Sequence, residues 1–77
     1  MVDAYILISA EPGTARDIFE KVKELDLVKS VEAVTGSYDL VAKIRADSLE
    51  KLTETVFSKI RGLKGVTSTS TLTVVEF

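Results

Sequence analysis

VKSVEAVTGSYDLVAKIR, residues 28–45, contains two runs in which apolar and polar side chains alternate. The runs cover residues 28–35 and 38–45, and their period of two is typical of strands with one covered face. Only Gly36 and Ser37 lie between them. A glycine in the first position suits a type II′ turn, because glycine adopts a positive φ without strain. The stretch therefore predicts a β-hairpin with a two-residue turn.

The segment before this hairpin predicts a strand and a helix. Residues 3–9 carry apolar side chains on both parities, as a central strand covered on both faces would. After Glu11-Pro12-Gly13, Thr14 and Asp17 form a capping box that opens a helix. The apolar stripe of this helix is Ala15, Ile18, Val22 and Leu25.

The segment after the hairpin predicts a second helix and a last strand. A capping box of Asp47 and Glu50 opens the helix, and Gly62 with Gly65 ends it. The apolar stripe of this helix is Leu49, Leu52, Val56, Ile60 and Leu63. Residues 66–77 are rich in Thr, Ser and Val and predict a long final strand. In the hairpin's second strand, alternation places Tyr38, Leu40, Ala42 and Ile44 on one side.

The element order β-α-β-β-α-β predicts an α+β protein of ferredoxin-like topology, a four-stranded antiparallel sheet with both helices on one face. The other face is then bare. Either Tyr5 with Leu7, or Ile6 with Ile8, faces away from the helices. Exposed apolar surface of this kind normally marks an interface, so we expect a dimer packed sheet to sheet.

Composition excludes several classes of function. The 77 residues contain no Cys and no His, which removes disulfides, thiolate or imidazole metal sites, Cys nucleophiles and Ser-His-Asp triads. Lys and Arg (10) are scattered among Asp and Glu (12), which argues against direct nucleic-acid binding. No apolar run suits a membrane span, and the start lacks the basic residues of a secretory signal. We expect a cytoplasmic protein without metal or cofactor.

The source is suggested by what the chain lacks. Asn and Gln are absent, while charged residues make up 29%. Loss of labile amides together with many charges is described for proteins of hot environments. The composition therefore hints at a thermophilic source.

The turn residues Gly36, Ser37, Tyr38 and Asp39 form the first candidate site. Backbone N–H groups around the glycine suit a ligand carboxylate, and Asp39 suits an ammonium group, so the turn would complement a free amino acid. The alternative is ordinary turn chemistry with a solvated aspartate.

The final strand provides the second candidate site. Alternation places Thr67, Thr69, Thr71 and Thr73 on one face, where a row of hydroxyls can bind polar ligand atoms. The alternative is a wet strand, since threonine is a common strand former.

Taken together, VTGSYDL (34–40), LKGV (63–66) and TST (69–71) resemble the C-terminal ligand-binding domain, or RAM domain, of the Lrp/AsnC transcription regulators. The resemblance covers nearly the whole chain. It implies a ferredoxin-like fold, sheet-to-sheet dimers and rings of dimers, commonly octameric. It also implies that an amino-acid effector binds between dimers. Carried over to this chain, the ligand-binding residues are Gly36, Ser37, Tyr38, Asp39, Thr69 and Thr71.

Family regulators carry a helix-turn-helix domain before this one, whereas here the first strand begins the sequence. We therefore expect residues 1–77 to form a single effector-binding and oligomerisation domain that does not itself contact DNA and that modulates partners, such as full-length regulators. Two alternatives are an ACT-like regulatory domain and assembly without any ligand. A third is a small dimeric ferredoxin-like enzyme, but acid-base chemistry would rest on Asp39 and Tyr38 alone, so we expect no enzyme.

Overall fold

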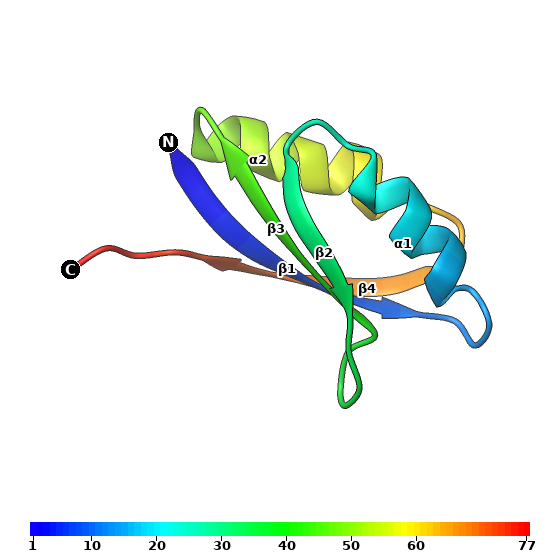
Figure 1. Cartoon of the computed structure of the whole chain (residues 1–77). Helices are drawn as coiled ribbons and strands as arrows, with labels where there is room; N and C mark the ends of the chain where they lie inside the picture. The colour runs from blue at the N-terminus through cyan, green and yellow to red at the C-terminus, as the bar shows by residue number, and fades with distance from the viewer.

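The computed structural model describes residues 1–77 as a sheet with helices on one face (Figure 1). The elements are β1 (Val2–Ala10), α1 (Ala15–Lys23), β2 (Val28–Ala33), β3 (Leu40–Ala46), α2 (Leu49–Thr55), a π-helical turn η1 (Val56–Ile60) and β4 (Val66–Thr73). The strands run antiparallel in the order β2-β3-β1-β4, which confirms the ferredoxin-like α+β fold.

The core lies between the sheet and the helices. Ile6 and Ile8 of β1 are fully buried, and their partners across the ladder to β3 are Ala42 and Leu40. The helices contribute the buried side chains Ile18, Val22, Leu52, Val56 and Ile60. Burying one such aliphatic side chain contributes about 1.5–3 kcal/mol to the free energy of folding. The arrangement that buries the apolar residues of both strand and helix patterns is therefore the favoured one.

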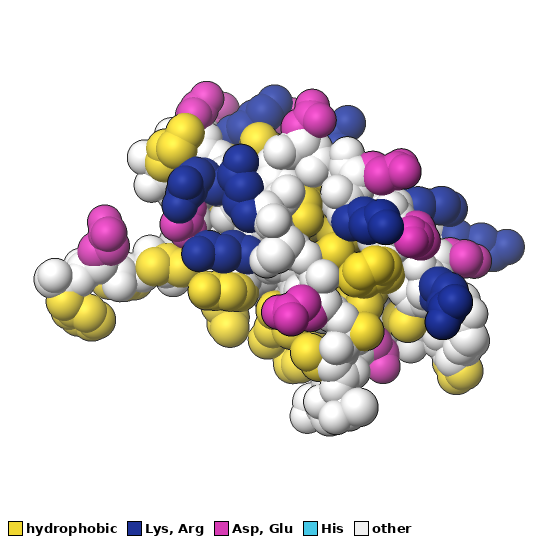
Figure 2. Space-filling view, in the orientation of Figure 1, with side chains coloured by type: hydrophobic (Ala, Val, Ile, Leu, Met, Phe, Trp, Pro, Cys, Tyr) yellow, Lys and Arg dark blue, Asp and Glu magenta, His cyan; other side chains and the backbone are white.

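The opposite face of the sheet carries an apolar strip. Tyr5 and Leu7 alternate with the buried residues of β1, and in the ladder to β4 Tyr5 pairs with Leu72. Tyr5 is 40% exposed and Leu72 is 53% exposed. Figure 2 shows hydrophobic side chains gathered on the side of the sheet away from the helices. Of the two predicted alternatives, Tyr5 with Leu7 is therefore the pair on the bare face.

The prediction of a two-residue hairpin turn is wrong. β2 ends at Ala33 and β3 begins at Leu40, so residues 34–39 form a longer loop that projects from the sheet (Figure 1). The loop is closed by the N–H of Val34, which donates to the carbonyl of Asp39 at 2.9 Å. Asp39 also bonds to the main chain of β1, so it holds the end of the loop to two neighbouring strands.

Both predicted capping boxes differ in detail from the structure. Thr14 precedes α1, but its hydroxyl donates to the carbonyl of Glu11 at 2.7 Å and caps no helical N–H. The N-cap of α2 is Ser48, not Asp47, and its Oγ accepts from the N–H of Lys51 at 3.1 Å. Ser48 has the extended backbone that an N-cap needs, so Ser48 and not Asp47 takes the N-cap position.

Two further predictions overestimate the extent of a feature: the burial of Leu49 and the length of the final strand. Leu49, assigned to the buried stripe of the second helix, is 55% exposed because it lies at the first turn beside the edge strand. The final strand ends at Thr73, and residues 74–77 extend away from the sheet (Figure 1). Only the first residue beyond β4 is anchored, by the N–H of Val74, which donates to the carbonyl of Asp3 at 2.8 Å.

Neither α1 nor the segment of α2 and η1 has the length and apolar character of a membrane-spanning helix.

Candidate functional site

The loop between β2 and β3 places its four predicted ligand-binding residues in different environments. Gly36 and Ser37 lie at the exposed tip, where Gly36 has φ +117° and no atom within 4 Å of an added Cβ. Tyr38 is half-buried and its hydroxyl lies 3.2 Å from Oγ of Ser70. Ser70 pairs with Leu7 on the open face of the sheet, so Tyr38 lies on this face and not, as alternation suggested, with Leu40.

Asp39 anchors the loop to β1. Its N–H donates to the carbonyl of Ile8 at 2.9 Å, and its Oδ2 accepts from the N–H of Ala10 at 2.8 Å. These bonds satisfy main-chain groups of β1 at the end of its ladder with β3. One carboxylate oxygen is therefore committed to the fold, and the other is free to accept from a ligand.

Thr69 and Thr71 lie on the other face of the sheet. They pair with Ile8 and Ile6, whose side chains are buried under the helices. β1 separates β4 from the position of Asp39, so the two backbones are about 10 Å apart at a strand spacing of about 5 Å. The structure thus brings Tyr38 to Ser70 but does not bring the loop and the two threonines into one site within a single chain.

Thr69 and Thr71 instead line a groove between β4 and the second helical segment. Its volume is about 330 Å³. The lining residues are Leu49, Thr53, Val56, Phe57, Arg61, Thr69, Thr71 and Thr73. Sequence reasoning missed the helical wall, although Leu49, Thr53, Phe57 and Arg61 recur at intervals of four residues, a spacing that places side chains on one helical face.

The groove combines one cation, several hydroxyls and exposed apolar carbons. The guanidinium of Arg61 lies 5.4 Å from the ring centroid of Phe57. Arg61 takes part in neither of the two ion pairs of the chain, and no acidic side chain lines the groove. The hydroxyls of the lining threonines make no hydrogen bond within the chain. Such a surface can accept an anionic group beside an apolar one.

The helical wall of the groove includes an irregular turn. Residues 56–60 are π-helical, and the N–H of Arg61 donates to the carbonyl of Val56 at 2.9 Å, a five-residue step. π-helical turns are rare in proteins, and those that do occur often lie at functional sites. Here the turn presents Phe57, which is 66% exposed, to the groove.

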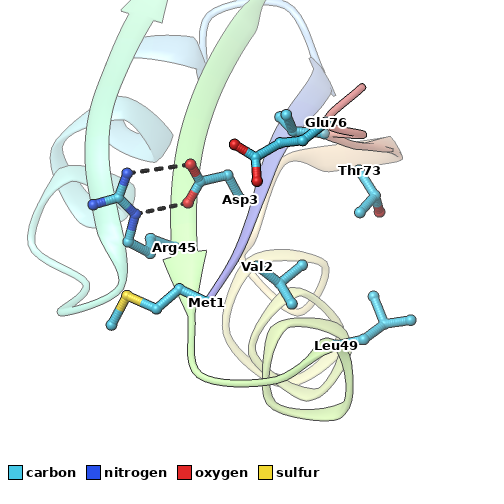
Figure 3. Close-up of a pocket in the computed structure, with 8 residues that line it drawn as sticks. Met1, Val2, Asp3, Arg45, Leu49, Thr73 and Glu76 are labelled. Atoms are coloured by element: carbon cyan, nitrogen blue, oxygen red, sulfur yellow. Dashed lines mark hydrogen bonds and ion pairs between the residues drawn. The ribbon is translucent and has the colours of Figure 1, made fainter.

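A second concavity of about 520 Å³ adjoins the groove at Leu49 and Thr73 (Figure 3). Its polar centre is the fork of Arg45, whose Nε and second terminal nitrogen lie 2.7 and 3.2 Å from the carboxylate oxygens of Asp3. The hydrogen bond from Arg45 lowers the pKa of Asp3, and the same bond raises the pKa of Arg45. These two charges satisfy each other, and the remaining charged side chain of the concavity, Glu76, is acidic. The concavity therefore offers an anionic ligand no free cationic side chain, whereas the groove offers Arg61.

Comparison with known proteins identifies the family. The profile of the family described as the Lrp/AsnC ligand binding domain matches residues 3–77. A relative from Pyrococcus horikoshii, the HTH-type transcriptional regulator PH1916, is 35% identical over 72 residues, which cover 90% of this chain and 48% of the regulator. The chain thus spans about half the length of the curated relatives it matches, and these relatives are named as transcriptional regulators.

Solved structures agree with this assignment. The protein TTHA0845 from Thermus thermophilus is 36% identical, with a TM-score of 0.95 over 100% of this chain and 96% of that one. The regulator NMB0573 from Neisseria meningitidis, solved as a complex with L-Met, shares the fold at a TM-score of 0.87 and 22% identity, over 97% of this chain and 50% of that one. The Pyrococcus and Thermus sources agree with the hint of thermophily. The chain belongs to the Lrp/AsnC ligand-binding domain family.

Proposed function

We propose that this chain is an amino-acid effector-binding and oligomerisation module that acts without catalysing a reaction. The observation that carries the proposal is the placement of its two candidate half-sites. Tyr38 lies on the open face and Asp39 bonds to the end of β1, whereas Thr69 and Thr71 line a groove on the helical face. If the two sets act on one ligand, they must come from different copies of the chain.

The chemistry of the half-sites is complementary. The groove supplies hydroxyls and a cation but no acid, and the loop supplies the free oxygen of Asp39. A zwitterion needs both kinds of group, because its carboxylate requires donors and its ammonium requires an acceptor. An amino acid held between two copies would therefore find its full complement of partners. The family's description as a ligand-binding domain and the L-Met complex of a protein with this fold support the same class of ligand.

Assembly in this proposal uses the bare face of the sheet. The apolar strip of Tyr5, Leu7 and Leu72 would pack against its counterpart in a two-fold dimer, and further contacts through the loops would join dimers into a ring. We propose that residues 1–77 act as one domain of the cytoplasm that contacts no DNA by itself. Its partners would be other copies of the chain and full-length regulators that contain the same domain.

The test measures ligand binding and assembly together. The purified chain is titrated with each of the twenty amino acids by thermal shift, and its size distribution is measured by analytical ultracentrifugation with and without the hits. Because a ligand at a site between copies stabilises the assembled state, a hit should shift the distribution toward larger species. Thermal stabilisation without any change in assembly would contradict a site between copies.

Two variants test the half-sites without disturbing the fold. Asp39→Asn keeps an oxygen for the N–H of Ala10 and removes the charge, so it is sharper than an alanine substitution. Thr71→Val removes one hydroxyl at constant shape, and Thr67→Val, outside the groove, is its matched control. We expect Asp39→Asn and Thr71→Val to weaken the hit by about tenfold, the cost of one charge-assisted hydrogen bond. Equal weakening by Thr67→Val would sink the assignment.

A further inference from the structure

The strongest unused feature of the molecule is the charge of Arg61 beside β4. It is the only charged side chain that lines the groove, and it has no ion-pair partner. Its backbone is held at the end of the π-helical turn, and its guanidinium lies over the ring of Phe57. Stacking on an aromatic ring restricts a guanidinium before any ligand arrives, so less conformational entropy is lost when it binds an anion.

The opposite wall of the groove can supply further donors to an anion. Thr69 and Thr71 alternate along β4 at about 6.6 Å, two residues of strand rise. Their hydroxyls are unpaired within the chain, as is that of Thr53 on the facing helix. A carboxylate has two oxygens with about four acceptor positions, which one guanidinium leaves partly unused. Threonine hydroxyls on the facing wall suit the remaining positions.

The rest of the groove is apolar and open to solvent. Phe57 is 66% exposed and Leu49 is 55% exposed, and both line the groove with Val56. Large apolar side chains left in contact with water next to a cation favour a ligand that carries an apolar chain on its anionic group. The volume of about 330 Å³ lies at the lower end of the range for small-molecule sites, which suits a ligand of the size of a single amino acid.

From these observations we infer that Arg61 binds the carboxylate of the effector and that Phe57 and Leu49 select effectors with an apolar side chain. The inference rests on the proposed function and assigns the ligand class of that site. It also assigns the ammonium group to the neighbouring copy, because no acidic side chain lines this groove. A carboxylic acid without an amino group should therefore bind the groove of a single copy.

The probes follow from this division of the ligand. L-Leucine carries all three groups, 4-methylpentanoate lacks the ammonium, L-leucinamide lacks the carboxylate, and glycine lacks the apolar chain. Binding is followed by amide chemical-shift changes at Phe57, Arg61, Thr69 and Thr71 and quantified by isothermal titration. We expect leucine and 4-methylpentanoate to shift these four amides. Leucinamide and glycine should bind at least about tenfold more weakly than leucine, because each lacks one anchoring contact.

The variants separate charge from packing. Arg61→Gln should weaken leucine and 4-methylpentanoate by about tenfold, and Phe57→Ala should reduce the preference for leucine over glycine. Arg16→Gln is the matched control, since Arg16 is an exposed arginine on α1 outside the groove. Circular dichroism checks that each variant is folded.

The outcomes distinguish this inference from the proposed function. If leucine binds Arg61→Gln as tightly as the original chain, or leucinamide binds as well as leucine, the role of Arg61 is overturned while effector binding stands. If 4-methylpentanoate binds at Arg61 but no amino acid changes the assembly, the groove assignment stands and the proposed function fails. If none of the probes shifts the four amides, both are overturned.

Discussion

Replacing Gly65 by alanine should be among the most damaging small changes in this chain. Gly65 is buried, has φ +98°, and lies in the turn before β4. An added Cβ would lie 2.6 Å from Oγ1 and 2.7 Å from Cβ of Thr14, distances at which atoms must move apart. The two turns are also tied together, because the N–H of Glu11 donates to the carbonyl of Gly65 at 2.7 Å. This bond and the one from the N–H of Thr14 to the carbonyl of Glu11 at 3.1 Å oppose a movement of the two turns away from each other.

The magnitude follows from two separate costs. A left-handed backbone at a residue with a Cβ costs about 1–2 kcal/mol. Forcing a methyl group into packed atoms costs a further amount of about 1–3 kcal/mol. Gly65→Ala should therefore lower the free energy of unfolding by about 2–5 kcal/mol. Since a domain of 77 residues has a total of roughly 4–12 kcal/mol, this is a large fraction of its stability.

The assay is urea unfolding followed by circular dichroism at one fixed protein concentration, because any assembly adds to the apparent stability. Gly13→Ala is the matched control: Gly13 has φ +82° but no atom within 4 Å of an added Cβ, so it carries the backbone cost alone. The combination with Thr14→Gly should recover part of the loss at Gly65. A Gly65→Ala variant no less stable than Gly13→Ala would refute the reasoning.

Three other changes test separate parts of the structure. Ser48→Ala removes the only side-chain cap of a helix and should cost about 0.5–2 kcal/mol by thermal unfolding, with Ser48→Asp as a control that keeps an acceptor. Arg45 lowers the pKa of Asp3 below its ordinary value of 3.8, so this contribution to stability is present above the unfolded-state pKa and is lost as pH falls through the folded-state pKa. Asp3→Asn should remove that part of the acid sensitivity in unfolding curves compared at neutral and acidic pH, and an unchanged pH dependence would count against it. Leu72→Glu places a charge in the apolar strip and should shift sedimentation toward the monomer, whereas assembly equal to that of the original chain would exclude this face as the contact.

The topology was predictable because it depends on burial patterns that the chain repeats many times. β1, β3 and both helices follow from the positions of buried residues such as Ile6, Ile8 and Ile18, and a shift of one residue would expose the whole set. β2 and β4 contain no fully buried residue and follow instead from alternation and from strand-forming residue types. Many weak preferences agree on one arrangement, so single errors do not change it. The bare face was predictable for the same reason, because both helices pack on one face of the sheet and leave the other face uncovered.

The loop between β2 and β3 was not predictable from local signals. Gly36 suits a two-residue turn, but the structure uses the side chain of Asp39 to bond the main chain of β1, and Tyr38 reaches across to Ser70. These are tertiary contacts between residues about thirty positions apart, which no turn preference contains. The cap at Ser48 is a smaller case, since Asp47 is equally good by residue type and only the backbone conformation decides.

One wall of the groove was predictable from the sequence and the other was not. Thr69 and Thr71 were identified from the strand, and the structure places both in a groove. The helical wall was overlooked because the stripe through Leu52 and Ile60 defines the core, and Phe57 with Arg61 lies beside it. A second stripe at intervals of four, ending in an arginine next to exposed aromatic carbon, is the signal that would have found the groove.

The placement of the half-sites has a consequence for regulation if the proposed function holds. A ligand that needs Asp39 from one copy and Thr71 from another binds only where two copies meet, so its binding energy adds directly to the stability of that contact. Linkage then works in both directions: effector promotes assembly, and assembly raises the affinity for effector. The apparent affinity would depend on protein concentration, which a site within one chain does not show. Titrations at two concentrations of the chain therefore distinguish a site formed by two copies from a site within one copy. An affinity that does not depend on the concentration of the chain would assign the ligand to the groove alone.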